Sequence, residues 1–332
     1  MNTASPVFAV IGGGSWATAI VKMLTENTKT IHWYMRNQMA IDHILLEEHN
    51  PNYLSSVAFD TSQLALSSDI NVVAEKADIL VFAIPSAFLS KELEKLKVSL
   101  KDKIVVSAIK GIVPESGLIV GEHFHNFHQV PFENIVVLTG PCHAEEVALE
   151  RLSYLTIACA DEDKAELIAK HFRSDYIKVT TSDDVVGTEY AAMLKNIYAV
   201  AAGIAHGLGY GDNFQSVLMS NAIREMKRFI RKVYKMKRNI NDSAYLGDLL
   251  VTGYSSFSRN RMFGTMIGKG YTVKSAQMEM RMVAEGYYAA KSAWLINQER
   301  KAKTPIINAV YEILYEDKSP KKAFKKLTEK LD

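Results

Sequence analysis

Short apolar runs alternate with longer polar segments in the first half of the chain. The runs are Val7–Ile11, Thr30–Tyr34, Ile79–Ile84, Ile104–Ala108 and Ile135–Leu138. Two further strands are predicted at Leu152–Ala160 and Tyr176–Thr180, on either side of a helix near Asp163–Phe172. Continuous apolar strands separated by helices are typical of a parallel sheet covered on both faces. The pattern therefore predicts an α/β, Rossmann-type doubly wound domain at the N-terminus.

The second half has a helical period instead. Helices are predicted over 184–208, 214–236, 258–268, 273–297 and 304–315, with an amphipathic, lysine-rich helix over the last fifteen residues. Apolar runs that predict strands become scarce there. We therefore expect two domains, 1–185 and 186–332, of which the second is all-helical.

Composition narrows the class of protein. The 332 residues carry a net charge of +2, so no overall field indicates a nucleic-acid partner. Two cysteines fit a reducing compartment, and neither a signal peptide nor a membrane-spanning run is recognisable, so a cytoplasmic protein without an integral membrane segment is expected. Residues 181–332 hold 24 basic and 15 acidic residues, an excess that suits an anionic substrate or is a solvated surface.

The first strand runs directly into a glycine loop. Gly12, Gly14 and Ala17 form the pattern G-x-G-x-x-A between that strand and a helix. Gly12 permits the tight turn, Gly14 lets the backbone approach a pyrophosphate, and the helix N-terminus offers its N–H groups to the phosphates. The loop predicts a dinucleotide site.

The end of the second strand bears on which dinucleotide binds. NAD sites often carry an acidic residue there, whereas this strand is followed by Arg36, and Asp42 lies further on. A cation at this point can meet the 2′-phosphate of NADP. The sequence favours NADPH over NADH, with an ordinary surface arginine as the alternative interpretation of Arg36.

Several further motifs place polar side chains where chemistry is expected. They are NPNYL, ADILVFAIPS, the Lys110-Gly111 pair, GPCHAEE, GTEYAAMLKNIYAVAAGIAHGLGYGDN, LGDLLVT, SRNR and VAEG. Together with GGGSWATA, and in this order, they resemble the bacterial NAD(P)-dependent glycerol-3-phosphate dehydrogenases over nearly the whole chain. The resemblance implies reversible reduction of dihydroxyacetone phosphate to sn-glycerol 3-phosphate, which supplies glycerophospholipid synthesis, and a homodimer.

The resemblance also implies roles for residues. Lys195 matches the family's proton-transfer lysine, Lys110 is its expected cationic neighbour, and Asp248 matches a substrate-site aspartate. Burial and Lys110 would lower the pKa of Lys195 while Asp248 would raise it, so the net direction stays open. Implied substrate contacts are Lys110, Gly140, Cys142, Lys195, Asp248, Ser258, Arg259 and Asn260. Implied cofactor contacts are Gly12, Gly14, Ser15, Trp16, Arg36, Lys110, Ala144, Arg259, Val283 and Glu285.

The chain departs from the family pattern at two places. Cys142 stands where the family usually has Ser or Thr, and a thiol donates a hydrogen bond only weakly. The stretch Asn241–Tyr245 replaces a glycine-rich segment before Asp248, so that loop is expected to be stiffer or differently placed. Two alternatives stay open: a β-hydroxyacid or phosphogluconate-type dehydrogenase, and a catalytically weak NADPH-binding redox sensor.

Three other patterns carry weaker signals. Gly203, Gly207 and Gly211 are spaced by four, which favours close helix packing or a helix end. The histidines near Phe124 lack acidic or cysteine partners, and no metal is expected. A basic helix carries Arg224, Lys227, Arg228, Arg231, Lys232 and Lys235. It is either a solvated face or a surface for anionic lipid.

Overall fold

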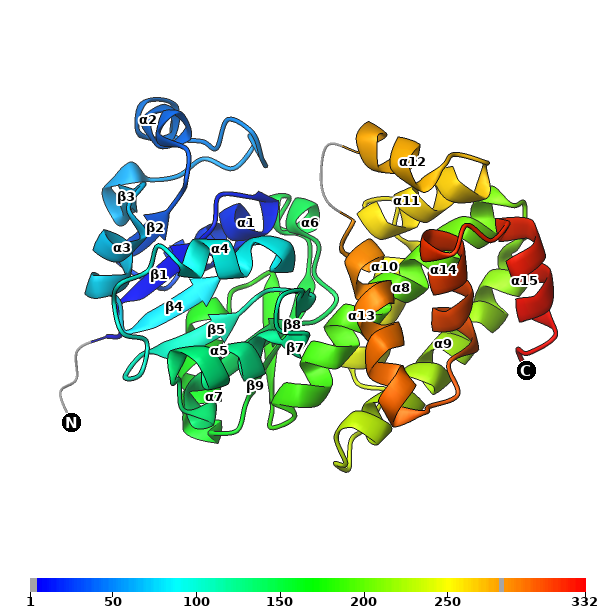
Figure 1. The fold of residues 1–332 in the computed structure, drawn as a ribbon. Helices are drawn as coiled ribbons and strands as arrows, with labels where there is room; N and C mark the ends of the chain where they lie inside the picture. The colour runs from blue at the N-terminus through cyan, green and yellow to red at the C-terminus, as the bar shows by residue number, and fades with distance from the viewer. Residues whose placement is uncertain (1–4, 281–283) are drawn as a thin grey trace. The chain divides into compact units, whose positions relative to one another are not determined.

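The computed structural model describes residues 5–280 and 284–332. It divides into two compact units, the first comprising residues 1–109 and 118–185 and the second comprising 110–117 and 186–332 (Figure 1). The segment 110–117 therefore groups with the helical unit, although the sheet of the first unit surrounds it in sequence. Each unit is described by itself below.

An eight-stranded sheet forms the first unit, in the order β10-β9-β8-β5-β4-β1-β2-β3. Its strands are β1 (Phe8–Ile11), β2 (Ile31–Tyr34), β3 (Leu64–Ser67), β4 (Ile79–Phe82), β5 (Ile104–Ser107), β8 (Ile135–Thr139), β9 (Ser153–Cys159) and β10 (Ile177–Ser182). Its helices are α1 (Ser15–Thr25), α2 (Gln38–Glu47), α3 (Ile70–Lys76), α4 (Leu89–Leu93), α5 (Val120–His128), α6 (Ala144–Ala148) and α7 (Glu162–Phe172). The short strands β6 (Ile112–Val113) and β7 (Leu118–Ile119) lie between β5 and α5.

Both faces of this sheet are buried, as the continuous apolar strands predict. Val10 and Val81 share one core cluster with Ile20 of α1 and with α7. Phe82, the next residue along β4, points to the opposite face, where its ring packs against Phe124 of α5 with the centroids 4.8 Å apart. The doubly wound architecture is confirmed.

The sheet departs from a purely parallel arrangement at one strand pair. Strands β8 and β9 pair antiparallel, with Val137 opposite Ala158, whereas every other strand pair of the large sheet is parallel. The connection between them holds only α6, whose five residues rise about 7.5 Å. This is too short to return the chain to the starting edge of the sheet, so β9 begins at the edge where β8 ends.

Apart from β6, the second unit is helical, as expected. Its helices are α8 (Val185–Gly207), α9 (Asp212–Val233), α10 (Asp248–Tyr254), α11 (Arg259–Gly268), α12 (Val273–Glu279), α13 (Glu285–Arg300), α14 (Pro305–Tyr315) and α15 (Pro320–Thr328). The single helix predicted over 273–297 is instead two, α12 and α13. At the start of α13 the N–H of Gly286, one of the first four that lack an acceptor within the helix, donates to Asn260 Oδ1 at 2.8 Å.

Helices α8 and α11 approach each other through glycines on both sides. A Cβ on Gly203 would lie 2.0 Å from the carbonyl oxygen of Arg261, and one on Gly264 would lie 2.1 Å from that of Val200. Gly207 meets Thr265 in the same way. The four-residue glycine spacing therefore serves close helix packing, while Gly211 is the N-cap of α9.

We expect Gly203→Ala to destabilise the protein by about 2 kcal/mol, because the new methyl group must push backbone away from backbone. Alanine's better helix propensity does not offset this displacement. Urea denaturation measures the change. Gly211→Ala is the control, since a Cβ there meets nothing within 4 Å. Equal midpoints for the two variants would contradict the close approach.

Candidate active site

The glycine loop begins at a position that only glycine fits. Gly12 has φ +137°, and a Cβ there would lie 2.4 Å from the carbonyl oxygen of Ala83 at the end of β4. Its N–H donates to the carbonyl of Tyr34, and its own carbonyl accepts from Trp33 Nε1 at 2.6 Å. The loop is thus held at the carboxyl ends of β1, β2 and β4, where the strand order reverses and where α/β sheets bind ligands.

The next part of the loop leaves room for a ligand. Gly14 is the N-cap of α1 without a side-chain cap, and a Cβ on it would meet nothing within 4 Å. The first turn of α1, which starts with Ser15 and Trp16, carries no acidic residue. Open space before uncapped amides fits a dinucleotide's pyrophosphate group.

Asn50 anchors this loop and is a residue whose role the sequence reasoning missed. Its side-chain amide is fully buried and donates to the carbonyl of Gly13 and to Thr18 Oγ1, at 3.2 and 2.9 Å. The residue stands at the start of the NPNYL motif, which was the available signal. Asn50 fixes the loop from the second strand–helix–strand unit, some 37 residues further along the chain.

Arg36 lies where the sequence places it, exposed just beyond the end of β2. The following residue, Asn37, caps α2 by accepting from the N–H of Met39. Asp42 lies on α2 and accepts from Gln38, at 2.8 Å, so its carboxylate is engaged by its own helix. The end of β2 therefore carries the cation Arg36. In the described structure, no acidic side chain takes the position that usually binds the ribose.

Three predicted contacts follow β8. Gly140 has φ +119°, and a Cβ on it would lie 2.7 Å from the carbonyl oxygen of Tyr154, so glycine is required here by the fold. Cys142 is a buried thiol, and Ala144 is buried at the start of α6. The burial of Cys142 fits a small buried thiol.

In the second unit, Lys195 and Asp248 form a buried ion pair. Lys195 lies in α8 and Asp248 is the first residue of α10, and their side chains are only 4% and 2% exposed. Lys195 Nζ donates to Asp248 Oδ1. Burying two charges costs free energy even when they are paired. A buried ion pair of this kind is therefore a candidate catalytic site.

Burial dominates the electrostatics of this lysine. Desolvation lowers the pKa of Lys195 to about 7, Asp248 opposes the shift, and the charge and hydrogen bonding of Lys110 add to it. The direction left open by the sequence is therefore downward. A lysine with a pKa close to neutral can both release and accept a proton at physiological pH.

A chain of amides joins the surrounding helices. Asn196 Nδ2 donates to the carbonyl of Lys110, and Asn196 Oδ1 accepts from Asn260 Nδ2, both at 2.9 Å. Asn260 Oδ1 in turn accepts from the N–H of Gly286. This network brings Lys110 and Asn260 to the helix that carries Lys195. The sequence analysis did not predict Asn196 as a site residue, although its position next to Lys195 pointed to such a role.

The SRNR motif forms the N-terminus of α11. Ser258 is the N-cap, with its hydroxyl accepting from the N–H of Arg261 at 3.3 Å, and Arg259 is the first helical residue and is half-buried. No acidic residue lies in the first turn. A cation such as Arg259 beside the positive end of a helix dipole is unfavourable unless a negative charge is nearby. The guanidinium group and the N-terminus of α11 together are therefore suited to bind an anion.

The two remaining predicted contacts lie near α13. Glu285 is the first residue of that helix and is half-buried. Val283 lies outside the described residues. Before α10, the stretch expected to be stiffer is helical: Ser243–Gly247 form a single π-turn that runs directly into α10 and delivers Asp248.

A glycine loop on a doubly wound sheet and a buried lysine–aspartate pair among helices define a nicotinamide-nucleotide dehydrogenase. The family models for the N- and C-terminal parts of NAD-dependent glycerol-3-phosphate dehydrogenase match residues 7–165 and 184–325. The chain belongs to this family.

Individual relatives agree. Glycerol-3-phosphate dehydrogenase [NAD(P)+] of Staphylococcus epidermidis is 34% identical over 97% of each chain, and that of an Exiguobacterium species is 36% identical over 96% of this chain and 94% of its own. The crystal structure of glycerol-3-phosphate dehydrogenase from Coxiella burnetii is 26% identical, with a TM-score of 0.89 over 98% of this chain and 99% of that one.

Two features are absent from the part of the chain that the structure describes. No helix within 5–280 and 284–332 is long and apolar enough to cross a membrane. Over the same ranges, no three His, Cys, Asp or Glu side chains gather in a group able to hold a metal ion.

Proposed function

We propose that this protein catalyses the reversible, NAD(P)H-dependent reduction of dihydroxyacetone phosphate to sn-glycerol 3-phosphate. The observation that carries the proposal is the buried Lys195–Asp248 pair beside Lys110, with the lysine pKa lowered to about 7. Reduction of a ketone needs a proton donor at the carbonyl oxygen, and the ammonium group of Lys195 is suited to donate that proton.

Lys195 Nζ holds the proton that the reaction consumes. Its ammonium group polarises the substrate carbonyl and transfers a proton to the oxygen as negative charge develops there. Asp248 accepts from Lys195 and so orients Nζ. The positive charge of Lys110 favours departure of the proton. In the reverse direction the neutral amine of Lys195 takes the hydroxyl proton.

The N-terminus of α11 is the proposed phosphate site. Arg259 supplies a planar guanidinium fork and Ser258 its hydroxyl, and Asn260 retains a second amide hydrogen beyond the one given to Asn196. Gly140 and Cys142 are the proposed contacts from the first unit. All these assignments follow the family resemblance, and the charge and helix geometry of α11 support those of Ser258, Arg259 and Asn260.

The nucleotide is proposed to bind at Gly12, Gly14, Ser15, Trp16, Arg36, Lys110, Ala144, Arg259, Val283 and Glu285. When bound, its nicotinamide supplies the hydride. Gly14 and the first turn of α1 hold the pyrophosphate, and Asn50 fixes the loop that presents them. Residues 1–185 act as the dinucleotide-binding domain and residues 186–332 as the substrate and catalytic domain, together with Lys110.

We expect Arg36→Ala to raise the KM for NADPH by about tenfold or more, which is the scale of one charge-assisted hydrogen bond, and to leave the KM for NADH nearly unchanged. The reason is that only NADPH carries the 2′-phosphate that Arg36 is proposed to meet. Steady-state kinetics with each cofactor measure the difference. Parallel changes would make Arg36 an ordinary surface residue.

One assay separates the candidate functions. With dihydroxyacetone phosphate, the oxidation of NADPH is followed by absorbance. With β-hydroxyacids and 6-phosphogluconate, the reduction of NADP+ is followed instead. Turnover confined to the triose phosphate supports the proposal. Turnover of the other substrates, or NADPH binding without any turnover, would contradict it. In the cell we propose a cytoplasmic homodimer that supplies glycerophospholipid synthesis.

A further inference from the structure

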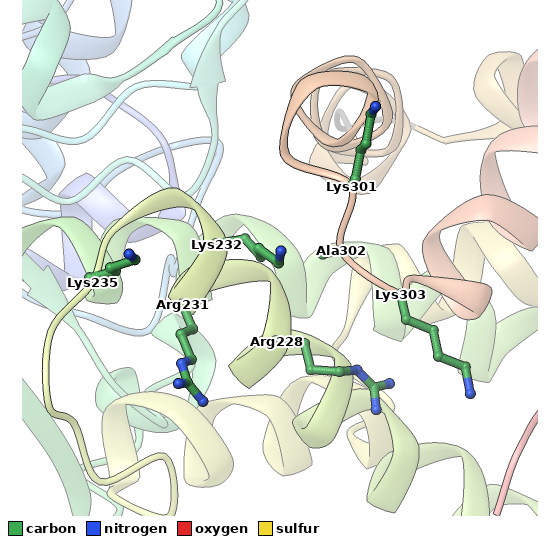
Figure 2. A pocket seen from close by; sticks show the side chains of 7 residues that line it. All are labelled: Arg228, Arg231, Lys232, Lys235, Lys301, Ala302 and Lys303. Carbon is green, nitrogen blue, oxygen red and sulfur yellow. The ribbon is translucent and has the colours of Figure 1, made fainter.

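A hollow lined almost entirely by cations lies in the second unit, outside the proposed active site. Its volume is about 380 Å³, which falls within the range of small-ligand pockets, roughly 300–1,000 Å³. The lining residues are Arg228, Arg231, Lys232, Lys235, Lys301, Ala302 and Lys303 (Figure 2). Six of the seven carry a positive charge and none a negative one.

These cations come from two segments far apart in the sequence. Arg228, Arg231 and Lys232 lie along one face of α9, at spacings of three and four, and Lys235 follows just after the helix ends. Lys301 and Lys303 belong to the link between α13 and α14, on the other side of the hollow in Figure 2. The fold therefore gathers charges that would repel one another.

Within the described residues none of the six cations forms a salt bridge, although Lys303 also lines a second hollow together with Glu329 and Asp332. The nearest acidic side chain on α9 is the buried Glu225, which interacts electrostatically with Arg228. Its two oxygens accept the N–H groups of Ile306 and Ile307 at 2.9 Å each. The Nε atom of Arg228 is buried without any hydrogen-bond partner. The hollow therefore retains both net charge and donor capacity.

Stabilisation of helix ends does not account for all of this charge. Arg231 and Lys232 lie in the last turn of α9 and Lys301 caps α13, so each interacts favourably with the negative end of a helix dipole. Lys303, in contrast, directly precedes the N-cap of α14, where a positive charge opposes the dipole. An anion in the hollow would offset this unfavourable interaction with the α14 dipole.

We propose that this hollow binds a small anion carrying two or more linked phosphate groups. Six cations around a concave site match several negative charges held close together, and arginine forks and lysine ammonium groups are the side chains that bind phosphate. The proposal commits to a polyphosphate in solution because the cations line a recess between two segments, which a small anion can enter.

The test is calorimetric titration of the whole protein with tripolyphosphate, at constant ionic strength and with NADPH saturating. The nucleotide keeps the probe out of the dinucleotide site. The test variant is Arg231→Gln/Lys232→Gln, and a second is Lys301→Asn/Lys303→Gln, since Lys301 has φ 52° and asparagine tolerates that conformation. The matched control is Lys325→Gln/Lys326→Gln, two exposed lysines on α15.

We expect both test variants to bind tripolyphosphate about tenfold or more weakly than the wild type, with the control unchanged. All variants should keep wild-type kcat with dihydroxyacetone phosphate, because none of the residues belongs to the proposed active site. Equal affinity in wild type and test variants would overturn the proposal. So would binding to phosphatidylglycerol-containing vesicles, lost in the test variants, without binding of tripolyphosphate.

Discussion

Replacing Lys195 by alanine is expected to abolish turnover while NADPH binding stays nearly intact. Loss of a positioned proton donor costs about 10²–10⁴-fold, and loss of carbonyl polarisation adds to this. The measurements are kcat with dihydroxyacetone phosphate and the Kd for NADPH by fluorescence titration. A variant that retained about a tenth of wild-type kcat would be incompatible with loss of the proton donor.

A second substitution separates proton transfer from ion pairing. Removing Lys195 leaves Asp248 buried without its partner, which costs about 3–5 kcal/mol in comparable cases, so Lys195→Ala alone confounds chemistry with stability. Lys195→Arg keeps a cation opposite Asp248 but cannot release a proton, since a guanidinium titrates above about 12. We expect the arginine variant to lose the roughly 10²–10⁴-fold that proton donation contributes, and to be more stable than the alanine variant. Substantial activity would reassign Lys195 to an electrostatic role.

The lowered pKa of Lys195 also sets a pH dependence. The reduction needs the protonated amine, so kcat/KM should fall as the pH rises above about 7, while the oxidation of glycerol 3-phosphate should rise over the same range. For stability the sign is the reverse of a usual salt-bridged lysine. Between about 7 and 10.5 the unfolded state binds more protons, so this group makes folding more favourable as the pH rises through that window.

The strand–glycine–helix start was predictable because local sequence alone dictates it. Gly12 must take a positive φ beside Ala83, and only a short apolar strand and a small-residue turn are needed to predict that. The buried strands, the helical second half and the glycine-mediated helix contact follow from periodicity in the same way. The family motifs added Lys195 and Asp248 as candidates, and the structure pairs them.

What escaped prediction depends on contacts between distant segments. Asn50 and Asn196 are ordinary polar residues in sequence, and their importance appears only when their amides meet Gly13 and Asn260. The contact between Asn260 and the N–H of Gly286, the second residue of α13, is of the same kind, because it joins residues 26 apart in the sequence. The pKa of Lys195 was open because burial and Asp248 act in opposite directions, and only the folded burial shows which dominates.

Arg259→Lys is expected to damage catalysis severely although the charge is preserved. Arg259 starts α11, next to the Ser258 cap, and is proposed to grip the substrate phosphate. Lysine offers a point charge on a flexible stem, so bidentate geometry is lost. That grip also positions the ketone, and a displacement of about 1 Å can cost on the order of 10²-fold in rate. We therefore expect kcat/KM for dihydroxyacetone phosphate to fall about tenfold or more.

The decisive comparison uses a substrate without the phosphate. Unphosphorylated dihydroxyacetone is expected to be a poor substrate of the wild type, because it cannot engage the guanidinium fork. Its kcat/KM should therefore change much less in Arg259→Lys than that of the phosphate ester. Steady-state kinetics with both substrates at saturating NADPH measure the ratio. A parallel loss on the two would place Arg259 with the cofactor or the fold, since only a phosphate contact predicts selective damage.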